Sequence, residues 1–113
     1  MQLNDICIFR RKNMSYFNKQ IHYEKIIELL CNYKKIDRSK LIEILKDEEC
    51  KYILFLLLNK YNCMDNENIY TDFKIKDRDN MYEIFKIAEK KLMINKNIRE
   101  MFFEAETIMK KIE

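Results

Sequence analysis

The 113-residue chain contains no glycine, no proline and no tryptophan. Without glycine it cannot form a phosphate-cradling P-loop, a dinucleotide-binding turn or a nucleophile elbow, so the enzyme folds that depend on these motifs are excluded. Long apolar runs are also missing, since the longest, residues 52–58, falls far short of the roughly 20 residues that a membrane span needs. These absences favour a small domain that is not embedded in a membrane.

Cysteine pairs with metal-ligand spacing are absent as well. The four cysteines are far apart in sequence, and the chain has one histidine, so we expect no zinc site, no other metal site and no cofactor. The N-terminus lacks the basic and then apolar order of a secretory signal. We therefore expect a cytoplasmic protein whose cysteines are reduced and serve as small apolar residues: Cys7, Cys31, Cys50 and Cys63.

Hydrophobic residues make up 48% of the chain and charged residues 36%, with a net charge of +3. This balance is typical of one soluble domain, and it permits nucleic-acid binding without requiring it. The charge is uneven, because residues 6–23 hold four basic residues, Arg10 and Arg11 among them, and no acid. We expect a basic N-terminal arm over residues 1–18 and a helical domain over residues 19–113.

Apolar residues recur at steps of three and four along most of the chain, which is the period of an α-helix. The expected fold is all-α, a compact bundle of about six helices joined by short turns. Residues 47–61 should form the core helix, because apolar side chains cover most of its circumference. Asn32 is expected to end the first helix, and the expected N-caps are Asp37 or Ser39, Asp65, and Asp77 or Asp79. The acids of residues 47–49 are expected to face the positive end of the core helix's dipole. The expected helices cover about residues 20–33, 39–46, 47–61, 66–73, 78–93 and 96–112.

Residues 47–93 combine a long buried helix, a tight turn, a short helix, a second tight turn and a polar-faced helix. This is the order of a helix-turn-helix unit, whose last helix enters the major groove of DNA. A plain helical bundle would give the same order, and it remains the alternative.

Two adjoining motifs sharpen this interpretation. Residues 69–73 read I-Y-T-D-F, and residues 74–80 read K-I-K-D-R-D-N. Residues 26–106, which contain them, resemble the C-terminal DNA-binding domain of the bacterial replication initiator DnaA and small helix-turn-helix modules of some transposases. In that family the two motifs are I-G-x-x-F and G-G-R-D-H-T-T, and the second opens the recognition helix. The resemblance implies a DNA-binding protein that is regulatory or comes from a mobile element or phage.

The chain departs from the family pattern at several positions. Tyr70, Lys74 and Ile75 replace the family's glycines, and residues 78–80 replace H-T-T. Acidic residues 47–49 stand where the family has an arginine-rich loop before the long helix. The fold would therefore be shared without the same origin recognition.

For double-stranded DNA as the partner, the start of the helix at residue 78 supplies the candidate base contacts. Arg78 suits guanine and Asn80 suits adenine, because each side chain offers two hydrogen-bonding groups to a base edge. The expected phosphate contacts are Lys74, Lys76, Lys86 and Lys90, with Arg10 and Arg11 from the arm. The acids Asp77, Asp79 and Glu83 on the same helix end oppose this function.

A second hypothesis is a helical protein-protein interaction module, an inhibitor or adaptor without DNA binding. Phe102 should be buried while Phe103 points outward, so Phe103 and Met101 are the candidate contacts to a protein partner or a second copy. An enzyme is not expected, because no nucleophile–base pair and no converging carboxylates are present. A continuous positive face over residues 74–91 would favour DNA, and a mixed face with exposed aromatics would favour a protein partner.

Overall fold

Residues 19–112 are described by the computed structural model, and they form α-helices with no strand among them. The predicted all-α fold of about six helices is confirmed for this part of the chain. The first described helix covers residues 19–34. It is followed by a 3-10 turn η1 (Arg38–Lys40) and by α2 (Ile42–Lys46), α3 (Glu48–Lys60), α4 (Asn68–Phe73), α5 (Arg78–Ile94) and α6 (Lys96–Ile112).

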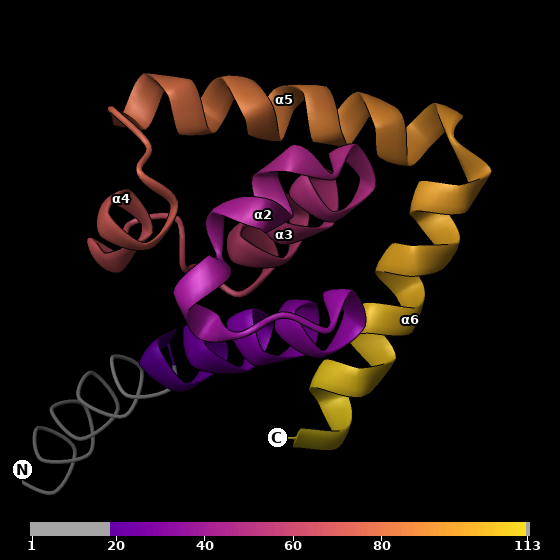
Figure 1. The fold of residues 1–113 in the computed structure, drawn as a ribbon. Helices are drawn as coiled ribbons and strands as arrows, with labels where there is room; N and C mark the ends of the chain where they lie inside the picture. Colours follow the sequence, from indigo (N-terminus) through magenta and orange to yellow (C-terminus); the bar gives the residue numbers. More distant parts are fainter. Residues whose placement is uncertain (1–18, 113) are drawn as a thin grey trace, which may run out of the picture.

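The α3 helix lies in the middle of the fold, as its composition predicts. Every residue from Tyr52 to Leu58 is buried, and Phe55, Leu57 and Leu58 are completely inaccessible to solvent. The α2, α5 and α6 helices pack against α3, with α5 across one side and α6 down another (Figure 1). A helix that is apolar on all sides is stable in water only when neighbours cover its whole circumference, and this arrangement provides that cover.

The α5 and α6 helices meet at a sharp corner (Figure 1). Asn95 makes this corner, because its backbone N–H donates to the carbonyl of Lys91 at 2.8 Å and its side-chain oxygen accepts from the N–H of Ile98 at 3.1 Å. One residue thus ends one helix and caps the next, which lets two 17-residue helices follow each other without a glycine.

Three turns use a left-handed backbone conformation that glycine normally adopts. They are centred on Lys35, Asn62 and Lys74, with φ values of 58°, 58° and 53°. The expectation that Asn32 ends the first helix is wrong: the helix continues to residue 34, and Lys35 takes the left-handed conformation. The N–H of Ile36 then donates to the carbonyl of Cys31 at 3.0 Å, which is the bond that closes a Schellman motif.

The predicted helix starts are partly correct. Asp77 caps α5 as predicted, accepting from the N–H of Asn80 at 2.8 Å. Asp47, expected only to face the helix dipole, also caps α3 by accepting from the N–H of Cys50 at 3.1 Å. Asp65 does not cap α4. Its carboxylate pairs with Lys19 at 3.7 Å, and the side chain of Asn66 accepts from the N–H of Asn68 instead.

The second expected helix is divided into two short pieces. Asp37 precedes η1 without accepting a capping hydrogen bond from its side chain, and Ser39 lies inside this 3-10 turn. Regular α-helical structure starts only at Ile42. The buried residues Leu41 and Ile44 hold the divided segment against the core, so packing and not capping determines its position.

The thiols of Cys31, Cys50 and Cys63 are free and buried, which confirms their role as small apolar residues; Cys7 lies outside the described residues. None of the helices formed by residues 19–112 combines the length and the apolar character that crossing a bilayer requires.

Candidate nucleic-acid interface and apolar groove

The α4 helix is short, and apolar anchors hold it to the core. Ile69 and Phe73 lie one turn apart on the same face and are 0% and 1% exposed. After Phe73 the chain turns through Lys74, and the buried Ile75 fixes the connection before Asp77 caps α5. The start of α5 is therefore fixed by two interactions: the cap from Asp77 and the burial of Ile75 in the turn before it.

Polar contacts also tie α4 to the first helix. The buried Tyr23 hydroxyl donates to Asp72 Oδ2 at 2.6 Å. Arg38 donates to the same Asp72 oxygen at 3.3 Å and to both oxygens of Glu24 at 2.7 and 2.9 Å. Burial, and then the hydrogen bond to Asp72, raise the pKa of the Tyr23 hydroxyl well above its usual value. The hydroxyl therefore stays protonated and continues to donate.

One side of α5 packs on the core and the rest of the helix is solvated. Met81 and Ala88 are completely buried, and Ile84, Phe85 and Leu92 are partly buried around them. The side chains of residues 76–80 are all exposed. The helix is thus presented outward along most of its length, as a recognition helix requires.

A basic row runs along the exposed side of α5. It consists of Arg78, Tyr82, Lys86 and Lys90, and all four are exposed. Residues spaced by four form a continuous ridge on a helix, and neighbours along it rise by about 6 Å. The row brings together three of the predicted contact residues; it rises by roughly 18 Å along the helix axis and winds about 120° around it. Sequence reasoning missed Tyr82, although the i, i+4 spacing places it between Arg78 and Lys86.

The acids of α5 occupy the adjoining row. Asp79 and Glu83 are exposed, four residues apart, and each follows a member of the basic row. Asn80 lies farther round the helix. Because successive residues are about 100° apart, Arg78 and Asn80 leave the helix about 160° apart. The structure does not bring these two predicted base contacts onto one line.

Lys74 and Lys76 lie in the turn that leads into α5, and both side chains are exposed. Arg10 and Arg11, the candidate contacts in the basic arm, lie outside the described residues. Among residues 19–112, no ion pair involves Lys74, Lys76, Arg78, Lys86 or Lys90.

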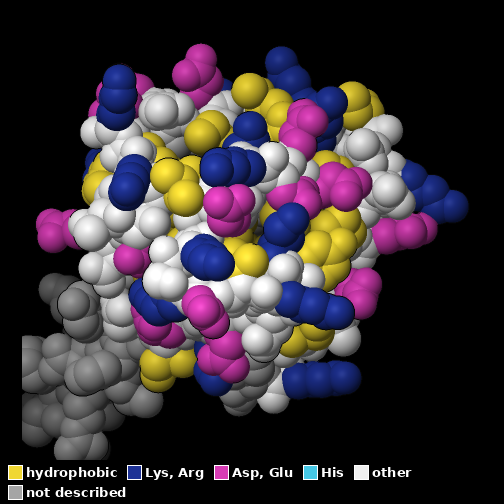
Figure 2. Space-filling model, in the orientation of Figure 1, with side chains coloured by type: hydrophobic (Ala, Val, Ile, Leu, Met, Phe, Trp, Pro, Cys, Tyr) yellow, Lys and Arg dark blue, Asp and Glu magenta, His cyan; other side chains and the backbone are white. Residues whose placement is uncertain are grey.

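The ion pairs that hold the fold lie elsewhere. Lys34 contacts Asp47 at 2.9 Å, and Lys60 contacts the largely buried Glu106 at 2.6 Å. The basic side chains on α5 are therefore not part of the ion pairs that stabilise the fold. Basic, acidic and apolar side chains are interspersed over the face shown in Figure 2, so this face has no broad positively charged surface.

The acidic residues at the start of α3 are used by the fold. Asp47 caps the helix and pairs with Lys34, and these two interactions hold the pKa of its carboxyl below the usual range. Glu48 accepts from the hydroxyl of Tyr52 at 3.0 Å, and Glu49 accepts from Asn97 at 3.5 Å. This segment, where the family resemblance would place a basic loop, offers no cation to DNA.

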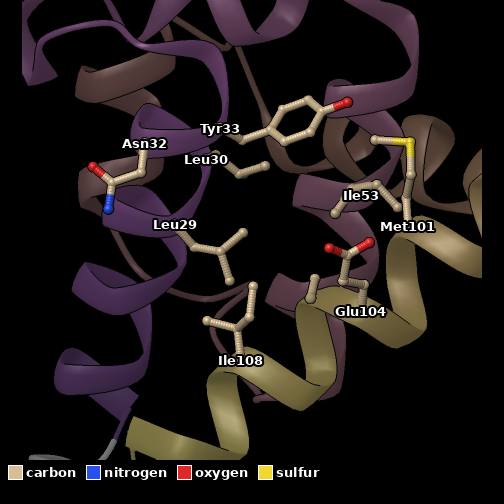
Figure 3. Close-up of a pocket in the computed structure, with 9 residues that line it drawn as sticks. Leu29, Leu30, Asn32, Tyr33, Ile53, Met101, Glu104 and Ile108 are labelled. Atoms are coloured by element: carbon tan, nitrogen blue, oxygen red, sulfur yellow. The ribbon is translucent and has the colours of Figure 1, made fainter.

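An apolar groove lies between the first helix and α6, with α3 as its floor (Figure 3). Its volume is about 320 Å³. Leu29 faces Ile108 across one part of the groove, and Tyr33 faces Met101 across the other (Figure 3). Leu30, Ile53 and Ala105 line the bottom, and Asn32 and Glu104 are its polar members.

The two residues predicted to contact a protein partner lie on different sides of α6. Met101 lines the groove, whereas Phe103 points away from it because the two positions are about 160° apart on the helix. Phe102 is buried and Phe103 is 57% exposed, which confirms the expected contrast between them. The groove is a feature that sequence reasoning missed, because its two walls are at least 68 positions apart in the chain.

The described residues bring together no group of three or more histidine, cysteine or acidic side chains that could hold a metal ion. The three buried thiols are poor nucleophiles near neutral pH, because a thiol reacts as its thiolate. Burial raises the pKa of Cys50 to about 11 and that of Cys63 to about 12. These residues support packing and give no candidate catalytic centre.

Comparisons of the chain with protein-family models, with curated proteins and with solved structures found no match.

Proposed function

We propose that the protein is a small, non-enzymatic protein that binds double-stranded DNA through α5. The observation that carries this proposal is the basic row on α5, which is exposed and has no ion-pair partner among the described residues. Unpaired basic side chains on a rigid helix can replace counterions along a phosphate backbone, and this release drives binding.

The turn before α5 supports the same function. Lys74 has a left-handed backbone at a position where the DnaA family, which this stretch resembles, has glycine. If the turn is shared, α5 would have the same orientation relative to α4 as a recognition helix has relative to the helix before it. The helix-turn-helix assignment of α4 and α5, and any relationship to that family, are part of the proposal.

The arrangement of charges favours phosphate contacts over base reading. Lys86 and Lys90 extend the line that starts at Arg78, while Asp79 and Glu83 in the next row would repel a second strand. Arg78 and Asn80 leave the helix about 160° apart, so only one of these two predicted base contacts can face the duplex. We therefore propose that binding depends weakly on DNA sequence, with Arg78 as the residue nearest to the bases.

The test measures binding of the full chain to a random 25-base-pair duplex at several salt concentrations. With the four lysines Lys74, Lys76, Lys86 and Lys90 as phosphate contacts, the logarithm of affinity should fall against the logarithm of salt with a slope of about −3 to −4. The variant Lys86→Glu/Lys90→Glu should weaken binding strongly and reduce the steepness of the slope by about two.

The matched control is Lys110→Glu/Lys111→Glu, which changes net charge equally at exposed positions on α6. It should reduce affinity much less, because these lysines lie outside the proposed surface. Equal losses in both variants would show that only net charge matters. Absence of binding at low salt would overturn the proposal.

The second candidate function is a protein-protein interaction module. The apolar groove between the first helix and α6 favours it, because its lining leaves Tyr33 60% exposed and Ile108 41% exposed. The mixed charge of the surface in Figure 2, with Tyr82 exposed on α5, meets the criterion set above for a protein partner and not the one for DNA.

A further inference from the structure

We infer that the groove between the first helix and α6 docks an amphipathic α-helix of a partner protein, and that this helix carries a lysine or arginine beside its apolar stripe. The inference rests on the second candidate function and specifies the class of partner. It is independent of DNA binding, because no groove residue belongs to α4 or α5.

The shape of the groove fits apolar side chains from another helix. Its two walls are helices, and its floor is the buried Ile53 of α3. A partner helix laid between two helices inserts side chains spaced by three and four residues into such a trough. Leu29 and Ile108 would contact one anchor, and Tyr33 and Met101 the next (Figure 3).

A small apolar molecule fits this site less well. Small-molecule sites usually enclose most of the ligand surface. Here Tyr33 and Ile108 retain 60% and 41% of their exposure, so the groove is open along one side. A helix closes such an opening with its own backbone and its solvated face.

The charge at the groove specifies the partner. Glu104 is the one charged residue in its lining, and no basic residue lines it. Neighbouring acids already have partners, since Glu100 pairs with Lys96 and Glu28 pairs with Lys25. Within the described chain Glu104 forms no ion pair, so a basic side chain on the incoming helix would complete it.

The experiment uses the full chain and two synthetic 18-residue helical peptides. Both carry leucine at positions i, i+3, i+4 and i+7, and their flanking positions are lysine in one peptide and glutamate in the other. Fluorescence anisotropy of the labelled peptides measures affinity. The lysine peptide should bind roughly threefold more tightly than the glutamate peptide, as expected for a solvent-accessible ion pair.

Substitutions separate the groove from the rest of the surface. Ile108→Asp should abolish binding of both peptides, whereas Ile94→Asp, at a position 77% exposed on the α5–α6 corner, should leave it unchanged. Glu104→Lys should reverse the preference between the peptides, and Glu100→Lys, one turn away, should not. Both isoleucines are solvent-accessible, so the circular dichroism of each variant should match that of the parent.

Each outcome supports or overturns the inference. If both peptides bind tightly with equal affinity, or if Glu104→Lys leaves the preference unchanged, the claim that the partner helix is basic is overturned. The claim that the groove docks a helix would still hold. No binding of either peptide at millimolar concentration would overturn both. Self-association that Ile108→Asp removes would identify a second copy as the occupant and would also overturn the inference.

Discussion

The hydroxyl of Tyr23 donates to Asp72 across 49 positions of sequence, with 2.6 Å between the two oxygens. This bond joins the first helix to α4, whose six residues could not remain helical without tertiary support. Arg38 contacts the same carboxylate, so three segments meet at one acidic side chain. This contact adds to the apolar anchors Ile69 and Phe73 that hold α4 on the core.

Removing the hydroxyl tests that role. Tyr23→Phe keeps the ring in the core but loses the hydrogen bond to a charged acceptor, so the free energy of unfolding should fall by about 1–2 kcal/mol. Urea denaturation followed by circular dichroism measures the change. Tyr33→Phe is the control, because Tyr33 is 60% exposed and its hydroxyl makes no hydrogen bond to the described residues. Equal destabilisation by the two variants would contradict the argument.

Local signals in the sequence were sufficient for most of the helical framework. The apolar period predicted α3, α5 and α6 and their buried faces, and Asp77 was recognised as a cap because side chain and helix start are adjacent. The errors lie at the ends of helices, as where Lys35 and not Asn32 takes the left-handed conformation. Asp65 lies three positions before α4 begins at Asn68, and its carboxylate pairs with Lys19 of the first helix.

The candidate surfaces depended on tertiary structure to different degrees. The basic row on α5 lies within one helix, so the i, i+4 spacing of residues 78, 82, 86 and 90 already contained it. The groove could not be found in this way, because Tyr33 and Met101 come from different helices. Only the packing of both helices on Ile53 brings their side chains together.

Asp47 should make the protein sensitive to acid. Hydrogen bonds from Lys34 and from the N–H of Cys50 lower the pKa of Asp47 in the folded state, so its contribution is complete above the unfolded value near 3.9 and is lost as pH falls below that value. Asp47→Ala should cost about 1 kcal/mol at pH 7 through loss of the cap.

Asp47→Asn separates the two contributions, because asparagine retains the capping oxygen but not the charge. Denaturation at pH 7 and pH 3 should show a small loss at pH 7, and a smaller decrease on acidification than the parent shows. A parent and Asp47→Asn with identical dependence on pH would rule out the ion pair with Lys34 as the source.

Alkaline conditions should destabilise the protein through groups that are buried in the protonated form. The pKa of Cys50 is raised to about 11 and that of Cys63 to about 12, mainly by burial. Their stabilising effect is complete below the unfolded thiol value near 8.5 and declines as pH rises toward the folded values. The free energy of unfolding should therefore fall steadily between about pH 8.5 and 11.

Two measurements check this trend. Cys50→Ala should flatten the dependence of unfolding free energy on pH, although it also lowers stability at pH 7. In the native protein at pH 8, Cys31, Cys50 and Cys63 should react with a thiol reagent far more slowly than in denaturant. Rapid reaction of all three without unfolding would show that they are accessible.

Lys74→Gly should stabilise the fold while weakening DNA binding slightly. Lys74 has φ 53° and ψ 41°, a left-handed conformation that costs a lysine roughly 1 kcal/mol and costs glycine almost nothing. Glycine also gains entropy in the unfolded chain, so the net stabilisation should be at most about 1 kcal/mol.

The matched control is Lys76→Gly, which removes the same charge from the same turn at a residue without positive φ. It should not stabilise the fold, and both variants should lose a similar share of affinity for duplex DNA if each lysine contacts one phosphate. Urea denaturation and a salt titration of duplex binding measure the two effects. Stabilisation by Lys76→Gly, or none by Lys74→Gly, would show that backbone strain at Lys74 is not the cause.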